Sequence, residues 1–476
     1  MNPRLIIAAV AGLVALGACG DESTEPVDPS PSAAGSATVG INVVLESEPT
    51  SALLRQLNEI GTVHDVLAEI NGVTMEARGD GLAAVRALPF VKAAAIDQEV
   101  FFPPPTDLVP VSDLSVGFST WNQDAINVTV EPQTTARGIT QTGQGVYVGV
   151  LDSGLLYTWR QYFPEERIAT QYAKSFVGGG PLDRGRIVSP PGELWQHDVC
   201  AHGTHVTSTI LGYQLGGTPV QGTAPQATVI PVQLKARGSP TARVSCSFFS
   251  SQAAAGLLYF AQLKQGPLAN SALVVNNSWG GGSLDPLVKE AVDYALAQGV
   301  LLVFAAGNAG EQGMGYPAAY APVISAAASG WTQEWTTPTW WNTTDVPEPT
   351  DDDDFYIIGI SSRAKAGQDL DVAAPGSWVV GPFQLQRGTA SYFPLGGTSA
   401  AAPHVTGTVA LMLQNDPSLT QADAESILEG HAIPLGPGCR TVIPAPGASS
   451  AQICWGADAT GAGLLDAAAA VAATTP

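Results

Sequence analysis

Three polar residues, each in a separate glycine-containing motif, are of the types that nucleophilic catalysis requires. Asp152 directly follows the apolar run 146–151, His202 begins the motif His-Gly-Thr-His-Val, and Ser399 lies within Gly-Gly-Thr-Ser-Ala-Ala-Ala-Pro-His. A serine hydroxyl needs a base to take its proton, and an imidazole base needs a carboxylate that fixes its tautomer and stabilises the imidazolium. The chain order Asp, His, Ser is one in which such a triad occurs. We therefore predict that Ser399 is a nucleophile, His202 its general base and acid, and Asp152 the residue that orients His202.

Other chemistry for these motifs is less well supported. His202 and His205 are three residues apart on an expected helix and could share a metal ion, but no third ligand is evident and the His-Glu-x-x-His spacing is absent. We expect His205 and His404 to have structural roles. The Gly-x-Ser-x-Gly elbow of α/β-hydrolase esterases does not fit at Ser399, because residue 401 is alanine.

Together the three motifs resemble those of the subtilisin-like serine peptidases. Ala306-Gly307-Asn308 resembles the oxyanion-hole segment of that family, and Asn277-Ser278-Trp279-Gly280 resembles its substrate-binding strand. The resemblance covers about residues 121–476. It implies a serine endopeptidase acting on proteins or peptides without a catalytic cofactor, in which the Asn308 amide and the Ser399 backbone N–H stabilise the oxyanion.

The same resemblance assigns residues to the substrate cleft. Ser278, Trp279 and Gly280 would bind the substrate backbone, and Gly315 matches a residue that lines the P1 pocket. Because glycine there leaves space, we expect apolar or aromatic P1 side chains. The alternative function is a catalytically silent binding module on the same fold, but such a relative should have lost at least one key residue, and this chain keeps all four: Asp152, His202, Asn308 and Ser399.

Apolar periodicity predicts two domains. In residues 39–100 it predicts the order β-α-β-β-α-β, a small ferredoxin-like α+β domain with a turn at Asn71-Gly72, which resembles the inhibitory propeptide of the family. In residues 121–476, continuous apolar strands alternate with helices, which predicts an α/β fold with a doubly wound, mostly parallel sheet covered by helices on both faces. The expected strands are 146–151, 228–234, 273–276, 300–304 and 323–327, and the expected helices are 202–212, 251–263, 287–298, 399–413 and 421–430.

Residues 101–120 contain Pro103-Pro104-Pro105 and are predicted to form an extended linker that carries the maturation site. The chain leading into it should lie along the strand at Ser278 and Gly280 as an added β-strand, with its end in the cleft like a bound product. The small domain would then be a folding aid and inhibitor released by self-cleavage. The other interpretation is a permanent accessory domain.

The N-terminus predicts export. Residues 1–18 read as a signal peptide, with a basic start and a short apolar run. Leu16-Gly17-Ala18-Cys19 resembles a lipoprotein lipobox, which predicts lipidation of Cys19 and a cell-envelope lipoprotein, at the outer membrane or cell surface, that could be released after maturation. Cys19 could instead lie near an ordinary cleavage site. Residues 20–38 have the composition of a flexible tether.

The other four cysteines are Cys200, Cys246, Cys439 and Cys454, and an even number in an exported chain indicates disulfides. No C-x-x-C pair occurs, which disfavours a zinc site. We predict that Cys439 pairs with Cys454, closing a short Pro/Gly-rich loop. The pairing of Cys200 with Cys246 follows from the resemblance, since related enzymes carry a disulfide beside the catalytic histidine.

The charge is strongly acidic, with 20 basic and 42 acidic residues and a net charge of −22. No Lys/Arg cluster stands out, so a nucleic-acid partner is not expected, and we expect a monomer. Residues 330–358 look like an insertion that contains the run Asp351-Asp352-Asp353-Asp354. Such carboxylates are either solvated or bound to a cation. Structural calcium is one prediction from the resemblance, without assigned ligands.

Overall fold

The computed structural model describes residues 37–102, 119–130, 136–180, 186–189, 194–197, 200–236, 246–336, 341, 345–348, 350–384, 388–445 and 447–474. The predicted signal peptide, Cys19, most of the tether and residues 103–118 of the linker lie outside the described residues. Among the described helices, none is long and apolar enough to cross a membrane.

The small domain has the predicted ferredoxin-like topology, with sheet order β2-β3-β1-β4 and antiparallel neighbours. Its apolar residues form a core of their own, separate from that of the large domain. The predicted turn lies at Asn71, whose φ of 50° is a left-handed conformation that asparagine tolerates. The elements are β1 (Thr38–Leu45), α2 (Ser51–Asn58), β2 (Thr62–Leu67), η1 (Ala68–Ile70), β3 (Gly72–Arg78), α3 (Gly81–Arg86) and β4 (Val91–Ile96).

The large domain is built on a sheet with the order β18-β17-β16-β15-β6-β13-β8-β9, in which β19 also pairs with β17. The central pairs are parallel, and β9 and β18 add antiparallel edges, which confirms the predicted mostly parallel sheet. The strands are β6 (Tyr147–Asp152), β8 (Lys174–Gly178), β9 (Ile187–Val188), β13 (Thr228–Lys235), β15 (Leu273–Asn277), β16 (Leu301–Ala305), β17 (Ile324–Trp331), β18 (Phe355–Ile357) and β19 (Val372–Pro375).

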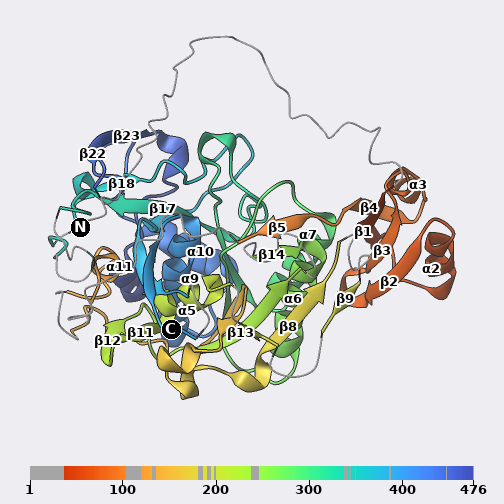
Figure 1. Cartoon of the computed structure of the whole chain (residues 1–476), viewed down its shortest axis with the longest axis horizontal. Coiled ribbons are helices and arrows are strands. Elements are labelled where there is room, and N and C mark those ends of the chain that lie inside the picture. The colour runs from red at the N-terminus through yellow and green to blue at the C-terminus, as the bar shows by residue number, and fades with distance from the viewer. Residues whose placement is uncertain are drawn as a thin grey trace, which may run out of the picture.

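Helices cover both faces of this sheet, because its strands are apolar throughout and cannot face water on either side. Helices α6 and α7 pack together on one face, and α5 and α9 on the other (Figure 1). The helices of the domain are α4 (Trp121–Asp124), α5 (His202–Leu211), α6 (Ser250–Gln265), α7 (Pro286–Ala297), α9 (Thr398–Asn415), α10 (Gln421–Gly430) and α11 (Ala467–Ala473).

Short two-stranded ribbons surround the sheet, and periodicity did not predict them. One of them joins the two domains, because β5 from the linker end of the small domain pairs with β14 of the large domain. The strands are β5 (Glu99–Phe101) with β14 (Ser247–Phe249), β7 (Leu155–Leu156) with β10 (Gln196–His197), β11 (Gly212–Leu215) with β12 (Thr218–Gln221), β20 (Val379–Pro382) with β21 (Tyr392–Leu395), and β22 (Gly438–Val442) with β23 (Ala451–Trp455).

The predicted insertion adds the edge strand β18 to the sheet. The acidic run beside it forms the short turn η6 (Asp352–Asp354), where Asp353 makes an ion pair of 2.6 Å with Arg440 of β22. This ion pair links the insertion to the β22–β23 ribbon at this edge of the domain.

Both predicted disulfides are present in the structure. Cys439–Cys454 links the two strands of the β22–β23 ribbon, and Cys200–Cys246 links the segment before α5 to the segment before β14. The second bond therefore connects the chain just before His202 to the chain that pairs with β5.

Candidate active site

The predicted site residues meet at the carboxyl edge of the parallel sheet. Asp152 is the last residue of β6, Ser278 follows β15 directly, and Asn308 lies three residues beyond β16. Strands β8 and β13, which follow β6 in the chain, lie on one side of it, and β15 and the later strands lie on the other side. Open α/β sheets bind their ligands at such a switch point, outside the carboxyl ends of the strands.

His202 and Asp152 form a buried pair. The Nδ1 atom of His202 lies 2.9 Å from both carboxylate oxygens of Asp152, and the side chains are 2% and 0% exposed. This places the Nδ1 proton toward the carboxylate and leaves Nε2 as the acceptor. Gly203 permits the approach, because a Cβ there would lie 2.5 Å from the Gly154 carbonyl oxygen.

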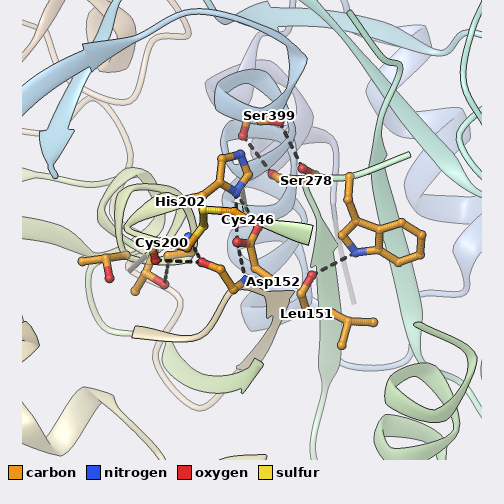
Figure 2. A network of polar contacts seen from close by, with 12 residues as sticks. Leu151, Asp152, Cys200, His202, Cys246, Ser278 and Ser399 are labelled. Atoms are coloured by element: carbon orange, nitrogen blue, oxygen red, sulfur yellow. Dashed lines mark hydrogen bonds and ion pairs between the residues drawn. A yellow bond between two sulfur atoms is a disulfide. The ribbon is translucent and has the colours of Figure 1, made fainter. Parts of the chain in front are cut away.

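Ser399 lies on the other side of the imidazole, in the first turn of α9. Figure 2 shows the His202 ring between Asp152 and Ser399. The Ser399 hydroxyl donates to the Ser278 carbonyl oxygen at 3.0 Å, while His202 Nε2 is buried and has no hydrogen-bond partner. Nε2 is therefore available to accept the hydroxyl proton, and hydrogen bonds of this kind are commonly loose before substrate binds.

A relay of hydrogen bonds fixes Ser278 against the nucleophile. The Ser278 hydroxyl donates to the Ser399 carbonyl oxygen at 2.8 Å and accepts from Asn276 Nδ2 at 2.9 Å. Asn276 Oδ1 in turn accepts from Thr406 of α9 at 3.0 Å. These hydrogen bonds connect β15 to α9 and so fix the position of Ser278 relative to Ser399.

The Asn308 side chain is held by its oxygen. Its Oδ1 accepts from the backbone N–H of Thr398 at 3.0 Å and from the Thr398 hydroxyl at 3.1 Å, and Asn308 lines the same cleft as Ser399. Both bonds use Oδ1, so the Nδ2 protons remain to be donated. Gly397 has a φ of 129°, and a Cβ there would lie 2.9 Å from Asn308 Nδ2, so this position requires glycine.

The two other histidines of the motifs are structural, as expected. His205 Nε2 lies 2.9 Å from the Val379 carbonyl oxygen, and burial lowers the pKa of His205 to about 3. His404 contacts the Ala400 carbonyl oxygen through Nδ1 and Asn122 through Nε2, and burial lowers its pKa to about 4. Both imidazoles therefore stay neutral at physiological pH.

The cleft beside Ser399 has a volume of about 410 Å³ and is walled by glycines. Gly280 and Gly315 both line it, and a Cβ on Gly315 would lie 2.8 Å from the Gly281 nitrogen. Any larger residue at 315 would therefore disturb the wall. Trp279 also lines the cleft, but its indole is 4% exposed and donates to the Leu151 carbonyl oxygen at 2.9 Å, so it supports the wall from the core side.

Strand β5 extends from the small domain to β14 (Figure 1), and its end contributes to the lining of this cleft. Phe101 is one of the residues that line it, and the Phe102 N–H donates to the Cys246 carbonyl oxygen at 2.8 Å. Two expectations need correction here. The added strand was expected beside Ser278 and Gly280, whereas its ladder partner is β14. The linker was expected to begin at residue 101, whereas Phe101 and Phe102 are still docked, because the ladder and the burial of Phe102 continue beyond Val100.

Asp97 anchors the small domain to α6. Its Oδ1 accepts from the Ser251 N–H at 2.9 Å, and its Oδ2 accepts from the Ser251 hydroxyl at 2.7 Å and the Gly180 N–H at 2.8 Å. A carboxylate at a helix N-terminus satisfies its open N–H groups and is stabilised by the helix dipole. The small domain thus supplies the N-terminal cap of a helix in the large domain.

A second buried carboxylate lies beside this contact. Asn42 of β1 donates through Nδ2 to Asp97 Oδ1 at 3.1 Å and to Asp285 Oδ2 at 3.0 Å. Asp285 caps α7 through the N–H groups of Leu287 and Val288, and its burial raises its pKa to about 6. The interface therefore brings two carboxylates together around one amide.

Among the described residues, one group of carboxylates has the spacing of a metal site. One oxygen from each of Asp369, Asp371 and Glu425 lies within 4.8 Å of the others. Asp371 is fully buried, and its Oδ1 has no hydrogen-bond partner, while Oδ2 accepts from Ser325. A hard cation with oxygen ligands fits this set. The predicted acidic run at 351–354 is not part of it.

Comparisons with known proteins agree with the fold. The profile of peptidase S8, the subtilase family, matches residues 143–456. The chain belongs to the subtilase family. It is accordingly a subtilisin-like serine endopeptidase, and its substrates are proteins or peptides.

Two relatives show the extent of the similarity in sequence. Subtilisin DY of Bacillus licheniformis is 31% identical over 299 residues, which cover 62% of this chain and 86% of the relative. A thermostable alkaline protease of Halalkalibacterium halodurans is 28% identical, with 86% of this chain and 90% of the relative covered. The second similarity is long enough to include residues before the matched family domain.

A solved structure shows the same fold over nearly the whole chain. Fervidolysin of Fervidobacterium pennivorans, described as a keratinolytic enzyme related to subtilisin, has a TM-score of 0.63 at 22% identity. The comparison covers 93% of this chain and 62% of fervidolysin. A psychrophilic protease has a TM-score of 0.51 and covers 73% of this chain.

Sequence reasoning did not find Phe102 and Phe248, which approach the site from the ribbon of β5 and β14. The rings of Phe102 and His202 are 5.2 Å apart, and those of Phe102 and Phe248 are 5.0 Å apart. The only signal was an apolar pair directly before the three prolines, which we assigned to the linker.

Proposed function

We propose that Asp152, His202 and Ser399 hydrolyse peptide bonds through an acyl-enzyme on Ser399. The observation that supports this most is the buried His202–Asp152 pair, whose Nε2 has no hydrogen-bond partner, with Ser399 on the side of the ring away from Asp152 (Figure 2). Ser399 Oγ attacks the substrate carbonyl carbon while His202 Nε2 takes the hydroxyl proton. Protonated His202 then gives a proton to the leaving amine, and water repeats the sequence on the acyl-enzyme.

The proposed oxyanion site uses Asn308 Nδ2 and the Ser399 backbone N–H. Both groups border the cleft at the start of α9, whose N-terminus favours the developing negative charge. The glycine walls near Gly280 and Gly315 leave room for a large apolar P1 side chain. Asp152 orients the His202 ring and stabilises the imidazolium.

Replacing the nucleophile tests this assignment. Ser399→Ala should abolish both peptide hydrolysis and covalent labelling by an organophosphonate, while the variant still unfolds in a cooperative thermal transition. A purified Ser399→Ala protein with undiminished hydrolysis would show that Ser399 is not the nucleophile.

We further propose that residues 39–102 inhibit the enzyme before maturation. Support comes from β5, which fills the strand position beside β14 and puts Phe101 into the cleft. Self-cleavage should fall between residues 102 and 121. Wild type should therefore shorten to a start in that window, while Ser399→Ala keeps residues 39–102 attached. A fully active wild type that retains the small domain covalently would contradict self-processing.

Export and membrane anchoring are proposals from the N-terminal sequence alone. Residues 1–18 would be removed and Cys19 lipidated, which leaves the enzyme on the cell envelope. A labelled fatty acid should mark wild type but not Cys19→Ala. Unlabelled wild type recovered from the medium would contradict the anchor.

We also propose that Asp369, Asp371 and Glu425 hold a structural calcium ion. The unpartnered Oδ1 of buried Asp371 supports the site, because a charged oxygen without a partner is costly to bury. In the Ser399→Ala background, chelation by EDTA should lower the melting temperature, and Glu425→Gln should remove that sensitivity. Glu429→Gln, one helical turn further along α10, is the matched control and should keep it.

A further inference from the structure

Glu334 is a buried carboxyl group that the proposed mechanism does not use. It lies in the predicted insertion, three residues after the end of β17, and is 1% exposed. In the described part of the chain its hydrogen bonds come from uncharged donors: the hydroxyls of Tyr356 and Ser377 donate to Oε2 at 3.2 and 2.9 Å, and the Trp331 N–H donates to Oε1 at 3.4 Å. Burial raises the pKa of Glu334 to about 8, so the group keeps its proton at neutral pH. A satisfied buried polar cluster of this kind holds its members rigidly.

Tyr356 reaches Glu334 from the edge strand β18. It is opposite Gly330 in the β17–β18 pair, and a Cβ on Gly330 would overlap the Tyr356 ring. Glycine therefore lets the ring lie over β17, from where its hydroxyl contacts both Glu334 and the Ser377 hydroxyl, which is 3.3 Å away. The insertion and the end of β19 thus meet at Glu334.

Ser377 connects Glu334 to the loop that precedes the nucleophile. It follows Gly376 just beyond β19, and the N–H groups of Ser377 and Gly376 donate to the Ser329 carbonyl oxygen of β17 at 3.1 and 2.8 Å. The Gly376 carbonyl oxygen in turn accepts from the Gly397 N–H at 2.7 Å. The two glycines are closely packed, since a Cβ on Gly376 would lie 2.8 Å from the Gly397 carbonyl oxygen. A shift of the turn at 376–377 would therefore move Gly397.

Gly397 is in direct contact with the Asn308 amide. A Cβ on Gly397 would lie 2.9 Å from Asn308 Nδ2, and the next residue, Thr398, donates to Asn308 Oδ1 through its N–H and its hydroxyl. The Thr398 hydroxyl also accepts from the Gly307 N–H at 3.0 Å. The place of the proposed oxyanion donor therefore depends on residues 397–398, which depend in turn on the position of Gly376.

We propose that Glu334 is a positioning residue of the oxyanion site. Through its bond to Ser377 it fixes the turn that binds Gly397, and it thereby sets the place of Asn308 Nδ2 relative to Ser399. Glu334 touches neither the substrate nor the reacting atoms, and it acts through Asn308. The inference rests on the proposed peptidase function and on the proposed oxyanion role of Asn308.

The test compares kcat and KM of wild type, Glu334→Leu and Ser377→Ala on one peptide substrate, with active enzyme counted by organophosphonate labelling. Both variants should lower kcat by about tenfold and leave KM nearly unchanged, because a displaced donor loses part of its effect only in the transition state. Glu334→Gln keeps an oxygen for the Ser377 hydroxyl and is uncharged, like the protonated acid. It should retain most of the wild-type kcat near pH 7.

Tyr356→Phe is the matched control for Ser377→Ala. It removes the other hydroxyl from Glu334 Oε2 but leaves the bond from Ser377, through which Glu334 reaches Gly397. Both variants should lower the melting temperature, because each deletes one buried hydrogen bond. Only Ser377→Ala should lower kcat.

A double-mutant cycle with Asn308 separates positioning from a general loss of packing. In the Asn308→Ala background, Ser377→Ala should change kcat by less than about twofold, since no amide remains to be displaced. The same loss of kcat with and without Asn308, or an unchanged kcat in Ser377→Ala, overturns the inference. If Glu334→Leu does not fold, Ser377→Ala and this cycle decide.

Two further outcomes distinguish this inference from the function on which it rests. An Asn308→Ala enzyme with the kcat of wild type would overturn the positioning role together with the oxyanion role, and would leave Ser399 as the nucleophile. A wild type with no inhibitor-sensitive hydrolysis would instead overturn the proposed function.

Discussion

The proposed oxyanion role of Asn308 depends on one side-chain amide, so this role is the simplest one to separate from substrate binding. Asn308→Ala should leave KM nearly unchanged and lower kcat by about 100- to 1,000-fold, the loss known for the corresponding amide in subtilisin, because the donor meets negative charge only in the transition state. Steady-state kinetics with one peptide substrate measure both constants. Because Oδ1 also binds Thr398, melting temperatures should be compared, and equal kcat values would remove Asn308 from the oxyanion site.

Asp285 gives the docked small domain a pH dependence. Its pKa is about 6 in the folded chain, against 3.8 for an unperturbed carboxyl group. Between these values the unfolded chain has lost the proton and the folded chain keeps it, so stability falls as the pH rises from about 4 to about 6 and stays lower above that window. In the Ser399→Ala background, Asp285→Asn should flatten the change of melting temperature across this window.

The melting temperature of Asp285→Asn at a single pH does not test this prediction, because the new amide also changes the contacts to Asn42 and Ser250. The test is the slope of melting temperature against pH. Asp124, whose pKa burial raises to about 7, should keep a residual slope of the same sign in both proteins. Identical slopes in parent and variant would contradict the role of Asp285.

At the scale of elements, Cys200–Cys246 holds the segment before the base and the segment before β14 as one unit. Replacing both cysteines by serine should lower kcat/KM by about tenfold or more, since a shift of about 1 Å at a reacting group can cost on the order of a hundredfold. The matched control is Cys439→Ser with Cys454→Ser, which should lower the melting temperature and leave kcat/KM unchanged. Equal losses of activity in both double variants would mean that the first bond has no special link to the site.

The elements also show what could be predicted from sequence. The strand ending at Asp152 and the helices starting at His202 and Ser399 carry long apolar patterns or strong motifs, so their existence and their meeting at one sheet edge were predictable. The pairing of β5 with β14 was not, because two three-residue strands far apart in sequence have no period to detect. Phe248 was missed for the same reason, since its partners come from distant segments.

At the scale of the whole molecule, the alternation of strands and helices in the sequence predicted the fold class and the order of the two domains. It did not predict the cation site. Asp369 and Asp371 come from the segment before β19, while Glu425 comes from α10, so only the packed structure brings the three together. The acidic run at 351–354 attracted attention because it is contiguous, yet its Asp353 is paired with Arg440. Contiguity in sequence is thus a poor guide to a shared ligand site.

The cap that Asp97 places on α6 has a consequence for the enzyme after the proposed removal of the small domain. On that removal, the Ser251 N–H and the Gly180 N–H lose the carboxylate that satisfied them. Water can replace these bonds but cannot bring the negative charge that offsets the helix dipole. The mature enzyme would therefore keep its shape with less support than it had while it was being made. A mature molecule that unfolds has no Asp97 to cap α6 while it refolds. Each molecule should therefore stay active only until it first unfolds.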